Sequence, residues 1–316
     1  MRLKNVRRLI KFKPAHRTFN ASKRVILPGF EGLSLYLVSK FFFQGIRNGA
    51  LNMRATSLAF SFFLALFPSV IFLFTLIPYI PIANFQDELF NLMKSLLPQS
   101  AFEATEETII DIIKNPRGGL LSFGFISALY FSTNGFNAMI NAFNETYHQI
   151  ETRSPLMQRL VAFLIVIVTT LLLLTAIALI IGTEFAFQRW IKRDNVEYYL
   201  IYYGQWFILV ALCYSFISFN YFMGPKSNKG WRFFSAGSVF ATILTIITSV
   251  LFAYYVNNFG NYNKLYGSIG TLIVIMLWLY INSLILLLGF DLNVSINRAK
   301  REKAYITIQS KKIKLK

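Results

Sequence analysis

The chain has 316 residues, of which 55% are hydrophobic and only 15% charged, with a mean hydropathy of +0.50 and a formal net charge of +18. This composition is too apolar for a water-soluble domain of this length and is typical of membrane proteins. A single cysteine, Cys213, excludes an intrachain disulfide and a Cys-rich metal site. We therefore expect an all-α polytopic membrane protein with no bound cofactor or metal.

The first 54 residues are predicted to stay on the cytoplasmic face. Residues 1–32 form a basic tail, which anionic lipid headgroups attract by about 1 kcal/mol per basic residue near the surface. The net charge also suggests a nucleic-acid binder, but the basic residues cluster at the two ends and in particular loops, so we expect no nucleic-acid partner. Residues 33–54 follow as an amphipathic helix with Lys40, Gln44 and Arg47 on one side, predicted to lie in the membrane interface.

Uncharged runs long enough to cross roughly 30 Å of hydrocarbon follow, and they predict a transmembrane domain over 55–291. The predicted spans are approximately 55–80, 120–144, 160–183, 199–223, 233–256 and 266–290. Six spans place both ends on one side of the membrane. Most of the 32 Lys and Arg residues fall in the two ends and in the loops after the second and fourth spans, which predicts cytoplasmic termini. Residues 292–316 are predicted to form a second basic tail.

The longest outer connection, 83–117, has the pattern of short helices. One apolar face stops at Pro98, and Ser100 with Glu103 resembles a capping box that opens another helix. We expect these helices to lie over the outer mouth of the bundle. Their acidic residues fit a solvated face, with a cation trap as the alternative.

The second predicted span carries a polar seam, defined here as Tyr130, Asn134, Asn137, Asn141 and Asn144. These residues recur at intervals of three and four, which stacks them on one helix face, and no charged residue occurs between Arg117 and Glu145. A charge-free helix with such a seam is expected to turn it toward other helices or a wet cavity. The seam is therefore either a polar path for a substrate or interhelical hydrogen bonding, for which Ser57, Ser61, Ser69, Asn282 and Ser283 are candidate partners.

A cytoplasmic ion-pair cluster is predicted at the inner end of the seam. Glu151, Arg153 and Arg159 follow the second span, and Asp291 ends the sixth. A carboxylate at the edge of the hydrocarbon is tolerated when it is paired or hydrated. The cluster is either a structural latch or a gate, and Asp291 is either an anchor for a basic residue or a proton or substrate site.

Three groups of residues resemble the YihY/BrkB family of bacterial inner-membrane proteins. They are Arg54-Ala55 with Leu66-Phe67-Pro68, then Asn144 with Glu151, Arg153 and Arg159, and last Tyr266 to Gly270 with Gly289 to Asn293. Asp291 departs from the family, which more often has glutamate there. The resemblance implies a six-span protein of the bacterial cytoplasmic membrane, with suggestions of envelope-linked transport and an old ribonuclease BN label.

The sequence favours a transporter or permease-like protein whose unidentified substrate passes or docks along the polar seam. A non-transporting membrane scaffold or envelope-maintenance protein is the alternative. A nucleotide-binding Gly loop and a Gly-x-Ser-x-Gly elbow are missing, and the cytoplasmic parts lack the ligands of a hydrolytic metal site. We therefore expect no enzyme and reject the ribonuclease label. The oligomeric state is not readable from the sequence.

Overall fold

A computed structural model describes residues 25–27, 29–48, 50–79, 87, 90, 106–107, 110–111, 115–146, 153–189, 196–226, 233–258 and 268–314. The described elements are helical, as predicted. They are α2 (Leu35–Asn48), α3 (Leu51–Leu76) with a short 3-10 turn η2 (Ile77–Tyr79), α6 (Gly118–Thr146), α7 (Pro155–Arg189), α8 (Val196–Met223), α9 (Ala236–Asn258) and α11 (Ser268–Lys314). The basic segment 1–24 and most of the outer connection 83–117 lie outside the described residues.

Among the described residues, five helices are long and apolar enough to cross a membrane. They are Leu51–Tyr79, Pro155–Thr183, Val196–Met223, Ala236–Val256 and Gly270–Ile306. The remaining predicted span, 120–144, is the 29-residue helix α6, which is long enough. Its polar seam makes it less apolar than the other five. The polytopic all-α class is confirmed, while the number of six spans stays a prediction.

Several helix boundaries differ from the sequence prediction, and two of these differences concern charged residues. The first span begins at Leu51, because Ala50 adopts a left-handed backbone with φ 45° and separates α3 from α2. Arg54 therefore lies in the first turn of the spanning helix and not at the end of the amphipathic one. The last helix continues through Asp291 to Lys314 as one rod of 47 residues, so most of the predicted tail 292–316 is helical.

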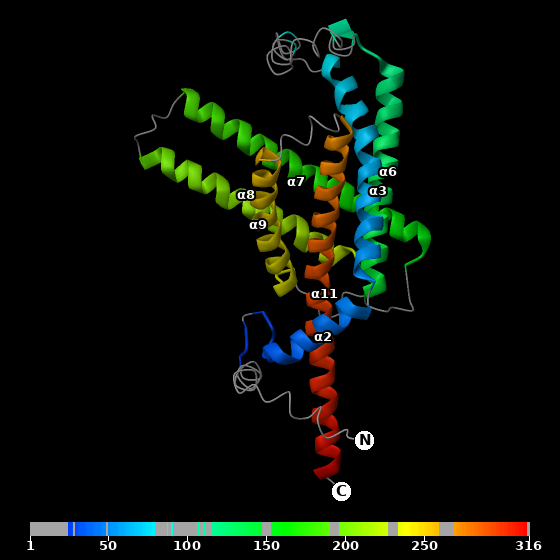
Figure 1. Cartoon of the computed structure of the whole chain (residues 1–316), viewed down its shortest axis with the longest axis vertical. Coiled ribbons are helices and arrows are strands. Elements are labelled where there is room, and N and C mark those ends of the chain that lie inside the picture. Colours follow the sequence, from blue (N-terminus) through cyan, green and yellow to red (C-terminus); the bar gives the residue numbers. More distant parts are fainter. Residues whose placement is uncertain are drawn as a thin grey trace, which may run out of the picture.

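Helix α11 is the central element of the fold (Figure 1). It contacts α3, α6 and α9 within the bundle and projects beyond it toward the C-terminus. Helix α2 crosses it at the level where it leaves the bundle, and Val38 packs there against Leu292 and Ile296. Helices α7 and α8 run side by side and extend away from the others.

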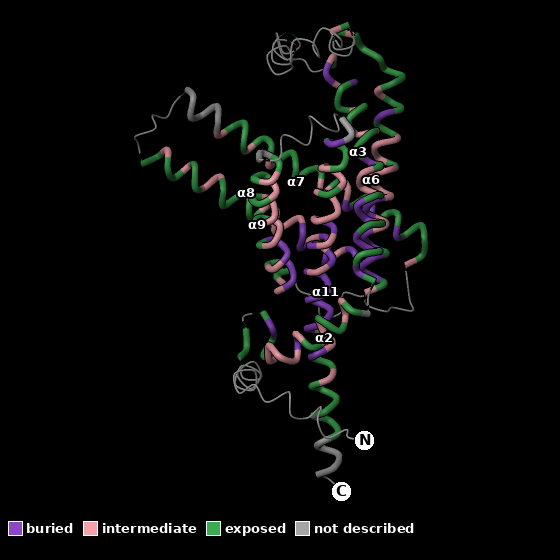
Figure 2. The backbone as a smooth tube through the Cα atoms, in the orientation of Figure 1, coloured by how far each residue is buried: buried purple, intermediate pink, exposed green. Residues whose placement is uncertain are grey.

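The core lies at one end of the bundle, the end where α3 begins and α6 ends (Figure 2). Phe143, Phe290 and Tyr221 meet there, with the rings of Phe143 and Phe290 stacked 4.1 Å apart. By contrast, large apolar side chains of α7 and α8 are exposed, such as Leu171, Leu173 and Phe207. A surface of this kind is what a lipid-facing helix requires.

Candidate functional site

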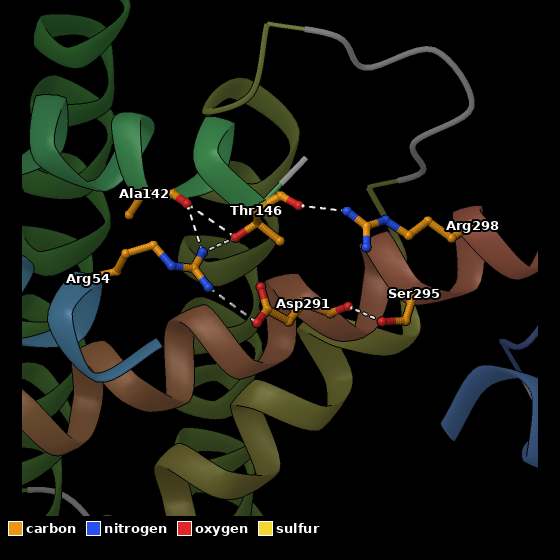
Figure 3. A network of polar contacts seen from close by, with 6 residues as sticks. All are labelled: Arg54, Ala142, Thr146, Asp291, Ser295 and Arg298. Atoms are coloured by element: carbon orange, nitrogen blue, oxygen red, sulfur yellow. Dashed lines mark hydrogen bonds and ion pairs between the residues drawn. The ribbon is translucent and has the colours of Figure 1, made fainter. Parts of the chain in front are cut away.

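A buried ion pair joins two distant parts of the chain (Figure 3). Arg54 of α3 and Asp291 of α11 are 6% and 2% exposed, and Arg54 Nη2 lies 3.5 Å from Asp291 Oδ2. Arg54 Nη1 donates to the carbonyl of Ala142, at 3.0 Å, and to the hydroxyl of Thr146, both on α6. One guanidinium therefore ties together α3, α6 and α11.

The rest of this network completes the contacts of α6 with α11. Arg298 Nη2 donates to the carbonyl of Thr146 at 3.1 Å, and Ser295 Oγ donates to the carbonyl of Asp291 at 2.7 Å (Figure 3). The carboxylate of Asp291 is less well satisfied: among the described residues, neither of its oxygens accepts a hydrogen bond of standard geometry. Ion pairs with good hydrogen bonds are about 2.7–2.9 Å long, so the 3.5 Å pair is a loose one.

The residues around Asp291 fix the start of α9. Gly237 of α9 and Gly289 of α11 cross so closely that a Cβ on Gly237 would lie 2.0 Å from the carbonyl oxygen of Gly289. Asn293 accepts the backbone N–H of Gly237 at 2.8 Å and donates to the hydroxyl of Ser235 at 2.9 Å. Small residues permit such close helix approach in membranes, and the asparagine satisfies a donor at the helix start.

Most of the polar seam faces α7. Gln158 Nε2 donates to the side-chain oxygens of both Asn137 and Asn141, at 2.6 and 2.7 Å. Arg159 donates to Asn134 at 3.3 Å, and its guanidinium lies 5.4 Å from the centre of the Tyr130 ring.

Asn144 differs from the rest of the seam. It is buried, and its side-chain oxygen accepts the backbone N–H of Lys226, just after α8, at 3.4 Å. The structure therefore brings four of the five seam residues onto α7 and directs the fifth toward the end of α8.

The partners of the seam are not the ones that the sequence suggested. Ser61, Ser69 and Asn282 donate to carbonyls of their own helices. The sequence prediction did not include Gln158 as a partner of the seam, although a polar residue in the first turns of a very apolar helix indicates a polar contact. Arg159 was assigned to the ion-pair cluster and not to the seam.

The predicted cluster of Glu151, Arg153, Arg159 and Asp291 is not assembled as expected. Glu151 lies outside the described residues. Arg153 donates to the carbonyls of Met223, Gly224 and Pro225 and so caps the end of α8; burial lowers the pKa of its guanidinium. Arg159 lies on the seam, and Asp291 pairs with Arg54. Asp291 meets Arg54 because α11 continues as a helix through the end of the bundle where α3 begins.

A pocket of about 360 Å³ opens beside the ion pair, between the start of α3 and the end of α6. Its polar lining residues are Arg54, Ser57, Asn141 and Glu145, and the others are small or apolar side chains of the same two helices and of the turn at Ala50. Pockets of this size hold small ligands, and a few polar groups in an apolar lining orient them. The pocket therefore reaches both Asn141 of the seam and Arg54 of the buried pair.

Comparison with known proteins identifies the family to which the chain belongs. The family described as "Virulence factor BrkB" matches residues 42–314. A ribonuclease-like protein, YfkH of Bacillus subtilis (strain 168), is 33% identical over 251 residues, which cover 78% of this chain and 90% of the relative. A UPF0761 membrane protein of Haemophilus influenzae (strain 86-028NP) is 24% identical over 272 residues, covering 82% and 95%. No solved structure matches. The chain therefore belongs to the BrkB family of integral membrane proteins.

Proposed function

We propose that this protein is a transporter or permease of the bacterial cytoplasmic membrane, with both termini in the cytoplasm. The distribution of Lys and Arg supports this orientation, because loops rich in them stay inside. The core end of the bundle, where α3 starts and α6 ends, is then its cytoplasmic end. The amphipathic helix α2 lies there on the membrane surface.

The observation that carries the proposal is the pocket of about 360 Å³ next to the buried pair of Arg54 and Asp291. Buried ionisable residues of membrane helices are costly even near the ends of the spans, and they commonly mark substrate or ion pathways. The pair is loose, and the pocket reaches Arg54 directly. A ligand in the pocket can therefore compete for the guanidinium and release α11 from α3, which makes the pair a gate.

We infer that the protein is not an enzyme, although the Bacillus subtilis relative has a ribonuclease-like name. In the described part of the site, the basic and amide side chains Arg54, Arg153 and Gln158 contact other side chains or helix carbonyls. Arg54 holds Asp291, Gln158 holds the seam and Arg153 caps α8. These are positioning contacts and not the nucleophile-and-base arrangement of a hydrolase.

The seam also favours a second candidate, a membrane scaffold that transports nothing. Gln158 satisfies Asn137 and Asn141 together, which is what interhelical hydrogen bonding requires. In that case the seam only packs α6 against α7.

Thiol labelling separates the two functions. In a Cys213→Ser background, Asn137→Cys is treated with a membrane-impermeant thiol reagent from either face of oriented vesicles. A transporter that alternates its access predicts reaction from both sides, because water follows the substrate path. Leu171→Cys on the exposed face of α7 is the lipid-facing control and should not react. Reaction at Asn137→Cys from one side only, or from neither, would contradict the transporter and favour the scaffold.

A further inference from the structure

The charges that line the pocket between α3 and α6 have opposite signs. Arg54 forms part of its inner wall and is almost buried, whereas Glu145, in the last turn of α6, is exposed. The other lining residues are uncharged. A simple anion that approaches Arg54 meets the Glu145 carboxylate, and a simple cation meets the guanidinium. The lining therefore selects for a ligand that carries both charges a few bonds apart.

The pocket lies at the level of lipid headgroups. Arg54 is in the first turn of α3, directly after the turn at Ala50 that joins this helix to the amphipathic α2. Glu145 is one residue before the end of α6. A bilayer changes from hydrocarbon to headgroups where its spanning helices end and its surface helices begin.

An apolar stripe leads away from the pocket along α3. Met53 lines the pocket and is 75% exposed, and Phe60 and Phe67 are 52% and 49% exposed. These residues are seven apart, so they share one helix face, and Leu64 adds to it. An acyl chain can lie along this face while a headgroup occupies the pocket. A free solute would gain nothing from the stripe.

We propose that the pocket binds the headgroup of a zwitterionic phospholipid, with the phosphate toward Arg54 and the ammonium group toward Glu145. The inference rests on the proposed transporter function, whose substrate class it names. The seam residues Asn134 and Tyr130 continue on the α6 face that lines the pocket at Ala138 and Asn141, so a headgroup that moves further along α6 would exchange contacts with Arg159, which now holds both. The acyl chains meanwhile stay on the apolar face of α3.

Binding of defined lipids to the purified full chain tests the proposal. Native mass spectrometry in detergent measures the affinities for phosphatidylethanolamine, which carries phosphate and ammonium, and for phosphatidylglycerol, which carries phosphate alone. We expect the wild type to prefer phosphatidylethanolamine. Glu145→Gln should lower that preference about tenfold, equivalent to about 1.4 kcal/mol. Glu197→Gln, an exposed change at the start of α8, is the matched control and should leave the preference unchanged.

A second variant and a soluble probe complete the test. Ala138→Phe fills the pocket and should abolish binding of phosphatidylethanolamine. Equal affinity for the two lipids, or an unchanged preference in Glu145→Gln, would overturn the proposal. Binding of glycerophosphoethanolamine as tight as that of the intact lipid would also overturn it, in favour of a free solute. Labelling of Asn137→Cys from both sides, without a lipid preference, would refute the assignment of a lipid substrate but still support the proposal of a transporter.

Discussion

Breaking the buried ion pair from one side should destabilise the protein far more than removing both charges. Asp291→Leu leaves the guanidinium of Arg54 without its carboxylate in a site only 6% exposed. Loss of one partner of a buried pair costs about 3–5 kcal/mol in soluble proteins. We expect a loss of this size in the free energy of unfolding.

The double variant Arg54→Met with Asp291→Leu should recover most of that loss. Replacing a buried pair by apolar residues of similar volume is often neutral or stabilising, so the coupling energy between the two sites should reach about 3 kcal/mol. Arg54→Met also removes the hydrogen bonds of Arg54 to the carbonyl of Ala142 and the hydroxyl of Thr146, although these two groups stay bonded to each other, so the recovery should end within about 1 kcal/mol of the wild type.

SDS-driven unfolding in mixed micelles measures these energies, with modification of Cys213 as the readout. This thiol is partly buried and is the only one in the chain. Removing one or both partners of the exposed pair of Lys300 and Glu31 is the control. It should change the free energy of unfolding little, since surface pairs contribute about 0–1 kcal/mol. Additive losses in the Arg54 and Asp291 double variant would refute the view that the pair acts as one energetic unit.

Further substitutions test the helix contacts. Gly237→Ala should lower the free energy of unfolding by about 1–3 kcal/mol, because its Cβ would lie 2.0 Å from a carbonyl of α11. Gly182→Ala is the control: its Cβ would have nothing within 4 Å, so the free energy of unfolding should stay the same or rise by up to about 1 kcal/mol. Gln158→Leu removes two interhelical bonds and should cost about 1 kcal/mol in the same assay, since such bonds average about 0.6 kcal/mol each; a loss beyond 3 kcal/mol would contradict this estimate. Asn137→Leu with Asn141→Leu should abolish lipid binding and leave membrane insertion unchanged, at a cost of only about 1 kcal/mol, because it removes the same two bonds; a loss beyond about 3 kcal/mol would favour the scaffold.

The sequence predicted the class of fold because that class follows from composition. Long uncharged runs identify spanning helices whatever their partners are. The boundaries were less predictable. The first span was predicted to begin after Arg54, since a charge inside hydrocarbon is costly. The carboxylate that pairs with Arg54 lies far along the chain, and a sequence does not show that pairing. The break at Ala50 depends on a left-handed backbone at a residue that rarely adopts one.

The candidate site was predictable only as a face and not as a set of contacts. A spacing of three and four places Asn134, Asn137 and Asn141 on one side of α6, and each of the three accepts a hydrogen bond from Gln158 or Arg159 of α7. Which helix they meet depends on how α7 crosses α6, and periodicity says nothing about that. The sequence prediction also ended the last helix too early, at the first charged residues. No Pro follows Asp291, so the charged segment continues as helix to Lys314.

The segment from Gly289 to Asn293 shows why these residues occur together. Gly289 permits the close crossing with α9, Asp291 pairs with α3, and Asn293 binds the start of α9. Gly289 and Asn293 are four residues apart and share the face of α11 toward α9, whereas Asp291, two residues from each, points to another side, toward α3. A ligand that loosens the pair at Asp291 leaves the glycine and asparagine contacts in place. Opening would then separate α11 from α3 while α9 stays attached to α11, which places the moving boundary at the pocket beside α3.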